Sequence, residues 1–490
     1  MSKRVAVIDI GSNSVRMVVY EKSSRFAFHI LHEAKSRVRL SEHAYQNNGV
    51  LQETPMQRAF DALDNFSSII SSLKARKTLC VATSALRDAP NKKDFINRVK
   101  NSLGIQIKVI DGEREAYLGA IACANLLPEQ KNALSIDIGG GSTEFSLVNN
   151  KEISLNISLN LGTVRLKELF FDKNDIEGAK KYIDSQLAQL QNINPQTIIG
   201  IGGTFRAISN AILNNSDYPI QKLHAFEPNY DEFIQLLKKI LVSDEDDLQK
   251  LGIKNSRFDI IKPGALILLR VFKKFKVKNL ITSGVGVREG VFLADLLRTA
   301  KDRFPPNYNT SMRYILDSHV DNIAYANQLC RVTKELFDLT RETLNIDKNY
   351  RYELAIAAKL YISGSSIHYY SHNRHSYYLI EDALEFGFTH KQIILIATLA
   401  RYAKRKLPSS AHIDKFRNLL PAVDQLNSLS YLLSLGVALL SHQPRNIDFT
   451  LSFEKGELKI ESKNSLYLAK ESIEKLELIK NGSINISFYS

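Results

Sequence analysis

The chain has 490 residues, 44% of them hydrophobic and 24% charged, which is the composition of a soluble globular protein with about two to four domains. Its formal net charge of +13 favours an acidic partner, such as a polyanion or a phosphate-rich small molecule. No helix-turn-helix, zinc-finger or RNA-binding aromatic signature accompanies this charge, so we expect no specific DNA binding.

The cysteines and the apolar runs favour a cytoplasmic protein. Cys80, Cys123 and Cys330 are far apart and show no Cys-x-x-Cys spacing, which argues against a disulfide framework or a zinc knuckle. No apolar run approaches the roughly 18 residues of a membrane span. The segment between Arg4 and Gly11 is too short for a signal sequence. We therefore expect a cytoplasmic location and no membrane partner.

Strand and helix patterns alternate along the first 126 residues. Strands are expected at 3–10, 15–20, 26–40, 78–83 and 105–110, and helices at 55–70, 94–103 and 113–127. The first strands follow one another directly, which predicts a β-meander. Thr54 is the expected N-cap of the first helix, because its hydroxyl can accept a bond from a free amide and Pro55 suits the first helical position.

The same plan then repeats. Strands are expected at 133–138, 143–148, 153–159, 197–201 and 279–282, and helices at 164–170, 176–190, 205–213 and 259–275. The acidic run Asp244–Asp247 is expected to be a linker. After a second linker at residues 302–307, helical periodicity continues to about Leu440, and strand-like alternation returns from Phe449.

Two of the predicted strands end in the same Asp-Ile-Gly motif, at Asp9 and Asp137. Glycines in a tight turn leave successive backbone N–H groups free to converge on an anion, and an aspartate at the strand end can hold a metal ion that accompanies a phosphate. Aspartate is also a common turn residue, but its repetition favours a functional role. The expected phosphate-binding residues of the two turns are Gly11, Ser12, Asn13, Ser14, Gly139, Gly140, Gly141, Ser142 and Thr143.

Two duplicated units that each open with this motif resemble the superfamily of actin, heat-shock chaperones and sugar kinases. Within it, the sequence is similar to the exopolyphosphatase/guanosine pentaphosphate phosphohydrolase (Ppx/GppA) family. Seven blocks in the family's order carry the similarity: Asp9-x-Gly-Ser-Asn-Ser14, Ala82-Thr-Ser-Ala-x-Arg87, Gly112-x-x-Glu-Ala116, Asp137-x-Gly-Gly-Gly-Ser-Thr-Glu144, Leu161-Gly-x-Val-Arg-Leu166, Gly200-x-Gly-Gly-Thr204 and Arg288-Glu-Gly290.

The resemblance implies an α/β fold with two duplicated actin/ribonuclease-H-like domains that flank a cleft. A mainly helical HD-like domain and a small α+β cap follow them. We expect the four domains at residues 1–126, 127–302, 303–445 and 446–490.

The resemblance also implies roles for single residues. Glu115 is the expected base or water-orienting carboxylate, and Glu144 the expected partner for metal or water. A glutamate in a helical first turn is favoured by the helix dipole in any case, and Glu113 is a nearby alternative. The expected Mg²⁺ ligands are Asp9, Asp137 and Glu144. Arg87 is expected to brace the phosphate unless it only pairs with Asp88, and Arg257 is a second phosphate-binding candidate.

A third glycine-rich turn, Gly200–Thr204, has two possible interpretations. In related ATP-binding proteins this position holds the nucleotide, so Gly202, Gly203 and Thr204 are expected to contact a nucleotide or distal phosphates. The turn can equally be a plain connection between a strand and a helix.

The expected function is exopolyphosphatase activity: Mg²⁺-assisted hydrolysis of the terminal phosphoanhydride of inorganic polyphosphate by a Glu115-activated water. The same site can cleave the γ-phosphate of guanosine pentaphosphate (pppGpp). The alternatives are an enzyme mainly for pppGpp, a sugar or acid kinase, and a non-catalytic sensor of (p)ppGpp or polyphosphate. A kinase needs an acceptor site with an aspartate base, and no block suggests one.

The C-terminal domain departs from an active HD hydrolase. The stretch Leu360–Gly364 lacks the His-Asp metal ligands, so we expect no metal and no chemistry there, although His368, His372 and His375 lie close together in sequence. The domain is instead expected to guide a long phosphate chain or to form a dimer surface.

Overall fold

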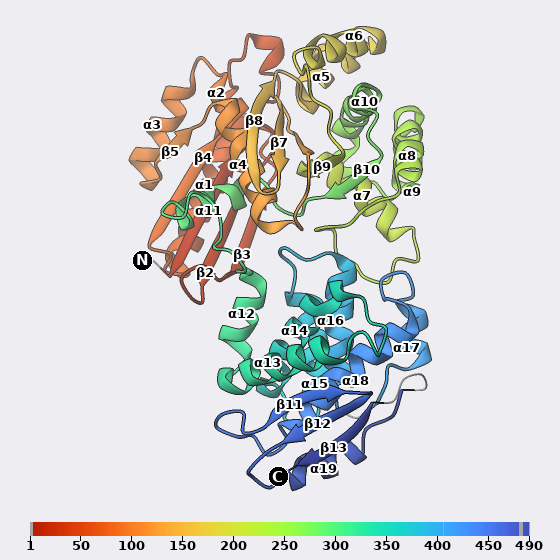
Figure 1. The fold of residues 1–490 in the computed structure, drawn as a ribbon. Helices are drawn as coiled ribbons and strands as arrows, with labels where there is room; N and C mark the ends of the chain where they lie inside the picture. Colours follow the sequence, from red (N-terminus) through yellow and green to blue (C-terminus); the bar gives the residue numbers. More distant parts are fainter. Residues whose placement is uncertain (1–2, 405, 480–483, 490) are drawn as a thin grey trace. The chain divides into compact units, whose positions relative to one another are not determined.

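The computed structural model describes residues 3–404, 406–479 and 484–489, in two compact units, Met1–Tyr308 and Asn309–Ser490 (Figure 1). The further division of the chain at residues 126/127 and 445/446 stays a prediction. Among the described helices, none combines the length and the apolar character that crossing a membrane requires.

The first sheet of unit 1 has the strand order β3-β2-β1-β4-β5. Its strands are β1 (Arg4–Ile10), β2 (Val15–Lys22), β3 (Phe28–Ser36), β4 (Lys77–Ala82) and β5 (Ile107–Val109). The first three strands form the expected antiparallel meander, and β4 and β5 continue the sheet in parallel with β1. The helices of this half are α1 (Glu53–Ser72), α2 (Ser84–Arg87), α3 (Lys92–Leu103) and α4 (Gly112–Leu126).

The second sheet repeats this topology with the order β10-β9-β6-β7-β8. Its strands are β6 (Ala133–Ile138), β7 (Thr143–Asn149), β8 (Glu152–Leu159), β9 (Thr197–Ile201) and β10 (Asn279–Thr282). Strand β6 takes the place of β1, since it pairs antiparallel with the strand after it and parallel with β9. The helices here are α5 (Thr163–Leu169), α6 (Ile176–Leu187), α7 (Gly202–Asn214), α8 (Tyr230–Val242), α9 (Glu245–Lys250), α10 (Phe258–Phe275) and α11 (Val287–Leu296).

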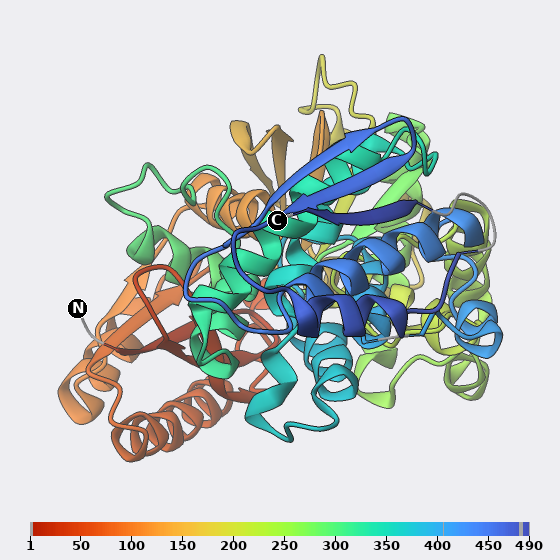
Figure 2. The same cartoon turned by 60° about the horizontal axis from the view of Figure 1, so that its bottom comes forward.

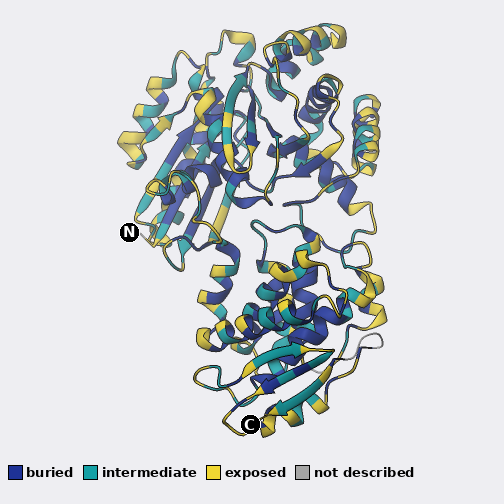
Figure 3. Ribbon diagram, in the orientation of Figure 1, coloured by how far each residue is buried: buried dark blue, intermediate teal, exposed yellow. Residues whose placement is uncertain are grey.

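Each sheet has its own core, because its β-branched and aromatic residues pack against helices (Figure 3). Helix α11 returns to the first half of the unit, where it packs on α4 and β1. Gly290 permits this approach, because a Cβ there would lie 1.9 Å from the Leu118 carbonyl oxygen of α4. The glycine of the Arg288-Glu-Gly290 block thus has a packing role.

Two expectations about local structure are wrong. Helix α1 begins at Glu53 with Gln52 at its N-cap, so Thr54 lies inside the first turn and makes no cap. Asp244–Asp247 is not a linker: the Asp244 carboxylate accepts a bond from the Asp247 amide at 2.8 Å and caps α9. A carboxylate at a helix start is stabilised by the free amides there, so an acidic run can begin a helix. Helix α8, capped by Asn229, is a further element that the sequence reading missed.

Unit 2 is mainly helical and ends in a three-stranded sheet, which Figure 2 brings forward. Its helices are α12 (Thr310–His319), α13 (Ile323–Thr340), α14 (Arg351–Leu360), α15 (His372–Ala383), α16 (His390–Tyr402), α17 (Ser410–Lys415), α18 (Val423–Leu439) and α19 (Tyr467–Glu474). Strands β11 (Thr450–Glu454) and β12 (Glu457–Glu461) form a hairpin, and β13 (Asn485–Tyr489) pairs in parallel with β12. Helix α19 packs on α18.

Candidate active site

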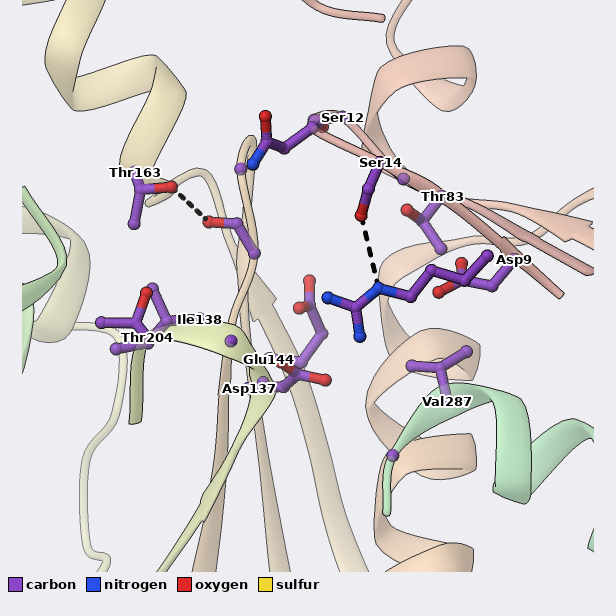
Figure 4. A pocket seen from close by; sticks show the side chains of 18 of the residues that line it. Asp9, Ser12, Ser14, Thr83, Asp137, Ile138, Glu144, Thr163, Thr204 and Val287 are labelled. Carbon is purple, nitrogen blue, oxygen red and sulfur yellow. Dashed lines mark hydrogen bonds between the residues drawn. The ribbon is translucent and has the colours of Figure 1, made fainter. Parts of the chain in front are cut away.

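A cavity of about 140 Å³ in unit 1 is lined by all three glycine-rich turns. Figure 4 shows Asp9 and Ser14 on one side of it and Asp137, Glu144 and Thr204 on the other. The expected site residues that line this cavity are Asp9, Gly11, Ser12, Asn13, Ser14, Glu115, Asp137, Gly139, Gly140, Glu144, Gly202, Gly203, Thr204 and Arg257.

The first two turns have the same internal hydrogen bond. The Gly11 amide donates to the Ser14 carbonyl at 3.1 Å, and the Gly139 amide donates to the Ser142 carbonyl at 2.9 Å. The turns approach each other closely, since a Cβ on Gly140 would lie 2.7 Å from the Ser12 Cβ. Residues far apart in sequence therefore present their backbone to one small space.

The aspartates at equivalent positions of the two sheets have cross-strand partners of opposite charge. In the first sheet Asp9 lies opposite Arg16, and in the second Asp137 lies opposite Glu144. Burial raises the pKa of Asp137 to about 6, where the nearby Arg206 opposes the shift and Asp9 adds to it. Burial also raises the pKa of Glu144 to about 7, and the charge of Asp137 contributes. The second half of the site therefore holds carboxylates that are costly to ionise together.

Glu115 enters the cavity from the first turn of α4. Asp111 caps this helix by accepting a bond from the Arg114 amide at 2.7 Å. A Cβ on Gly112 would lie 2.3 Å from the Ser158 Cβ, so the helix start packs directly on β8. The Ser158 hydroxyl in turn donates to Glu144 at 2.8 Å. The close approach at Gly112 thus brings Glu115 near β8 and near Glu144 on the adjacent strand β7.

The structure separates Glu115 from its neighbour Glu113. Glu115 is buried and lines the cavity, whereas Glu113 is exposed and does not. Burial raises the pKa of Glu115 well above its usual range, and the charge of Glu144 raises it further. Arg87 opposes this shift, because its Nη1 donates to Glu115 Oε2 at 2.9 Å.

Four expected phosphate-binding residues do not line the cavity: Arg87, Gly141, Ser142 and Thr143. Arg87 contacts Glu115, at 2.9 Å, and the Ser142 hydroxyl, at 3.4 Å; its Nε lies 3.5 Å from an Asp88 oxygen. The Thr143 hydroxyl donates to the Leu161 carbonyl, and Gly141 packs against Tyr45 and Ser84. The side chains of Arg87, Ser142 and Thr143 thus bond to protein groups next to the cavity.

Three arginines line the cavity without having been assigned from the sequence: Arg16, Arg206 and Arg288. Burial lowers the pKa values of Arg206 and Arg257 to about 10, and the charge of Arg16 lowers both further. Arg288 has a carboxylate partner, Glu33, at 2.7 Å. Asp137 and Glu289 offset this repulsion at Arg206, and Asp259 offsets it at Arg257, but burial and the neighbouring arginines prevail. A cavity lined by these guanidinium groups favours an anionic ligand.

The other cavity-lining residues with polar side chains that the sequence did not indicate are Thr83, Ser84, Thr163 and Glu289. Arg288 and Glu289 belong to the Arg288-Glu-Gly290 block, to which no role was assigned. Arg16 follows Ser14 at the two-residue spacing that places side chains on one face of a strand. Arg206 lies about one helical turn after Gly202, so these spacings indicate both arginines in the sequence.

The cavity carboxylates suit a divalent cation only together with other ligands. Among the described residues, no group of three or more His, Cys, Asp and Glu side chains could hold a metal ion by itself. Asp9, Asp137 and Glu144 do line the cavity, and burial raises the pKa of each. Mg²⁺ usually binds one or two carboxylates together with substrate phosphates and waters, so these residues suit an ion that arrives with a phosphate.

Two sheets of one topology, with carboxylates, arginines and glycine-rich turns around a shared cavity, define a phosphate-handling enzyme of the actin-like fold class. The sequence model of the Ppx/GppA phosphatase family matches residues 18–299, and the model of Ppx/GppA phosphatase domain III matches residues 309–481. The chain belongs to the Ppx/GppA phosphatase family and is a hydrolase of phosphoanhydrides.

Two curated relatives carry the name guanosine-5'-triphosphate,3'-diphosphate pyrophosphatase. The protein of Photobacterium profundum is 27% identical over 420 residues, which cover 84% of this chain and 82% of that protein. The protein of Vibrio campbellii is 28% identical over 418 residues, which cover 82% of this chain and 81% of that protein.

Solved structures give the same family. A Ppx/GppA family member of Aquifex aeolicus is 28% identical with a TM-score of 0.53, over 63% of this chain and 100% of that chain. An exopolyphosphatase of Cytophaga hutchinsonii is 27% identical with a TM-score of 0.56, over 60% of this chain and 97% of that chain.

Proposed function

We propose that this enzyme is an exopolyphosphatase that removes the terminal phosphate of inorganic polyphosphate and that the same site cleaves pppGpp to ppGpp. The observation that carries the proposal is the arginine cluster beside a buried glutamate: Arg16, Arg206 and Arg257 line the cavity that also holds Glu115. Such a cavity offers positive charge along an extended anion and one carboxylate to activate water.

The terminal phosphoryl group would lie between the first two turns, whose residues Ser12, Ser14 and Gly140 line the cavity. Glu115 would accept a proton from the attacking water, and the raised pKa of its carboxyl makes it a stronger base than an exposed glutamate. Asp9, Asp137 and Glu144 would hold Mg²⁺, which supplies charge neutralisation on the phosphate oxygens when bound.

The distal part of the substrate would reach the third turn. A Cβ on Gly203 would lie 2.2 Å from Arg257 Nη2, so this guanidinium lies directly against the turn. An extended phosphate chain and the 3'-diphosphate of pppGpp both present anionic oxygens there. The names of the two curated relatives favour pppGpp as a substrate, and the exopolyphosphatase among the solved structures favours polyphosphate.

Phosphate release from polyphosphate, pppGpp, and ATP plus a sugar tests this proposal, with Mg²⁺ and with EDTA. We expect Mg²⁺-dependent release from polyphosphate and pppGpp, a loss of roughly 100-fold or more in Glu115→Gln, and near-normal rates in Glu113→Gln. The Glu113 variant is a matched control, because it changes an exposed glutamate in the same helical turn.

Other outcomes distinguish the alternatives. Phosphorylated sugar without free phosphate would identify a kinase. Tight binding of either polyanion without turnover would identify a sensor, and unchanged rates in Glu115→Gln would remove this residue from its proposed role.

A further inference from the structure

Unit 2 contains a tyrosine-lined cavity of about 410 Å³ that the proposed reaction does not use. Tyr325 of α13, Tyr361 at the end of α14 and Tyr369 in the next loop line it, together with polar groups from α15, α18 and α19. Tyr361 is 3% exposed, whereas Tyr369 is 69% exposed. The cavity thus has an aromatic floor and an aromatic residue at its solvent-accessible side.

Gly364 makes this arrangement possible. A Cβ there would lie 2.1 Å from the His372 carbonyl oxygen and 2.4 Å from the Ser376 amide. Because Gly364 has no side chain, the start of α15 packs directly on the loop after α14. His372 is thereby held in edge-to-face contact with Tyr361, with 4.8 Å between the ring centroids.

Two polar atoms of the cavity-lining residues have no protein partner within the described part of the chain. His372 Nδ1 and the Ser441 hydroxyl oxygen are both buried and make no hydrogen bond. Burial lowers the pKa of His372, although a hydrogen bond with the Tyr361 backbone opposes the shift. The neutral ring has one nitrogen that donates and one that accepts. Buried polar atoms normally find partners, so both atoms are suited to a ligand with hydrogen-bonding edges.

A basic hollow of about 340 Å³ adjoins this cavity, because Lys404 lines both. Its other lining residues are Asn373, Arg374, Arg401, Tyr402 and Lys406, and no acidic residue in the described part of the chain lines either space. Within the described residues, Arg374, Lys404 and Lys406 form no ion pair. The Lys404 ammonium instead donates to the Tyr370 carbonyl at 3.2 Å.

We propose that unit 2 binds a nucleoside diphosphate or triphosphate, with the base among the tyrosines and the phosphates in the adjacent basic hollow. Tyrosine faces and free hydrogen-bonding atoms recognise a planar heterocycle. Unpaired lysine and arginine side chains recognise phosphates. An inorganic phosphate chain would use the basic hollow and leave the aromatic cavity unoccupied, so the tyrosines favour the nucleotide.

The site is tested on the full-length protein with GDP as the probe. Nitration of tyrosines by tetranitromethane, mapped by mass spectrometry, reports on unit 2 separately from the cavity in unit 1. We expect GDP to protect Tyr369 and to leave Tyr467 reactive. Tyr467 is a matched control, because it is also 69% exposed and does not line the cavity. Equal nitration of Tyr369 with and without saturating GDP would overturn the proposal.

Variants give a second measurement. Tyr369→Ala and Arg374→Glu should each lower the GDP affinity of this site by roughly tenfold. Tyr467→Ala and the exposed control Lys391→Glu should leave it unchanged. Calorimetry resolves this site as the component of GDP binding that Tyr369→Ala weakens, and no such component would contradict the proposal.

Pyrophosphate and guanosine separate the two halves of the ligand. We expect neither to protect Tyr369 at concentrations where GDP does. Equal protection by pyrophosphate would overturn the nucleotide in favour of an inorganic polyanion, and equal protection by guanosine would overturn the role of the basic hollow. Polyphosphate hydrolysis, measured alongside, tests the proposed function separately, because neither Tyr369 nor Arg374 lines the cavity in unit 1.

Discussion

Arg87 Nη1 lies 2.9 Å from Glu115 Oε2, at a position where the sequence suggested a phosphate ligand. The arginine contacts the proposed base and not the cavity itself, so its effect on the reaction passes through the carboxylate. Arg87 lowers the pKa of Glu115, which burial and the charge of Glu144 raise.

Replacing Arg87 by alanine should therefore shift the pH dependence of hydrolysis. Without the guanidinium the pKa of Glu115 rises, so a larger fraction of the base is protonated at neutral pH. We expect the acidic limb of kcat against pH to move to higher pH and kcat at pH 7 to fall by roughly tenfold or more. Arg98→Ala, on α3, is the control. An unmoved limb in Arg87→Ala would contradict this coupling.

The Glu144→Gln variant should change stability in a pH-dependent way. The pKa of Glu144 is raised from 4.5 to about 7, so its contribution to the free energy of unfolding is fully present below pH 4.5 and is lost as pH rises through 7. Glutamine does not ionise. Between these limits, the free energy of unfolding of the variant should therefore increase relative to that of the unmutated protein, by up to about 1.4 kcal/mol per pH unit. Thermal unfolding at pH 5 and pH 7 without divalent cations measures this difference, and equal differences at the two pH values would contradict it.

The Arg257→Gln variant should separate binding from folding. Burial and then repulsion from Arg16 and Arg206 lower the pKa of Arg257, so replacing it should not lower the thermal stability of the ligand-free protein. The KM for polyphosphate should rise by roughly tenfold, because a charge-assisted contact with the distal phosphates is lost, with a smaller effect on kcat. An unchanged KM would place the substrate elsewhere.

The Gly290→Ala variant should destabilise unit 1. Its Cβ would collide with the backbone of α4, and such overpacking typically costs about 1–3 kcal/mol. Because α4 carries Glu115, we expect lower activity and a lower melting temperature. Gly119→Ala is the control on α4, since its Cβ would make only an ordinary 3.5 Å contact with Ile201. Equal stability of the two variants would contradict the packing role of Gly290.

The sequence by itself determined most elements and both Asp-Ile-Gly turns, because these depend on local properties. Strands β6 and β9 have the predicted bounds, since apolar runs and the glycines after them are read within a few residues. It failed where a short element depends on a cap, as at Asp244, whose carboxylate starts a helix.

Only the tertiary structure decided which side chains share the cavity. Glu113 and Glu115 are two residues apart on one helix, and the packing of α4 against β7, β8 and α11 leaves Glu113 exposed and Glu115 buried. Arg16, Arg206 and Arg257 come from separate elements and meet only when the two sheets are in place. Their charges repel one another across long sequence distances, and no local pattern records such an interaction. The physical reason is that burial and charge at a site are properties of the packed chain.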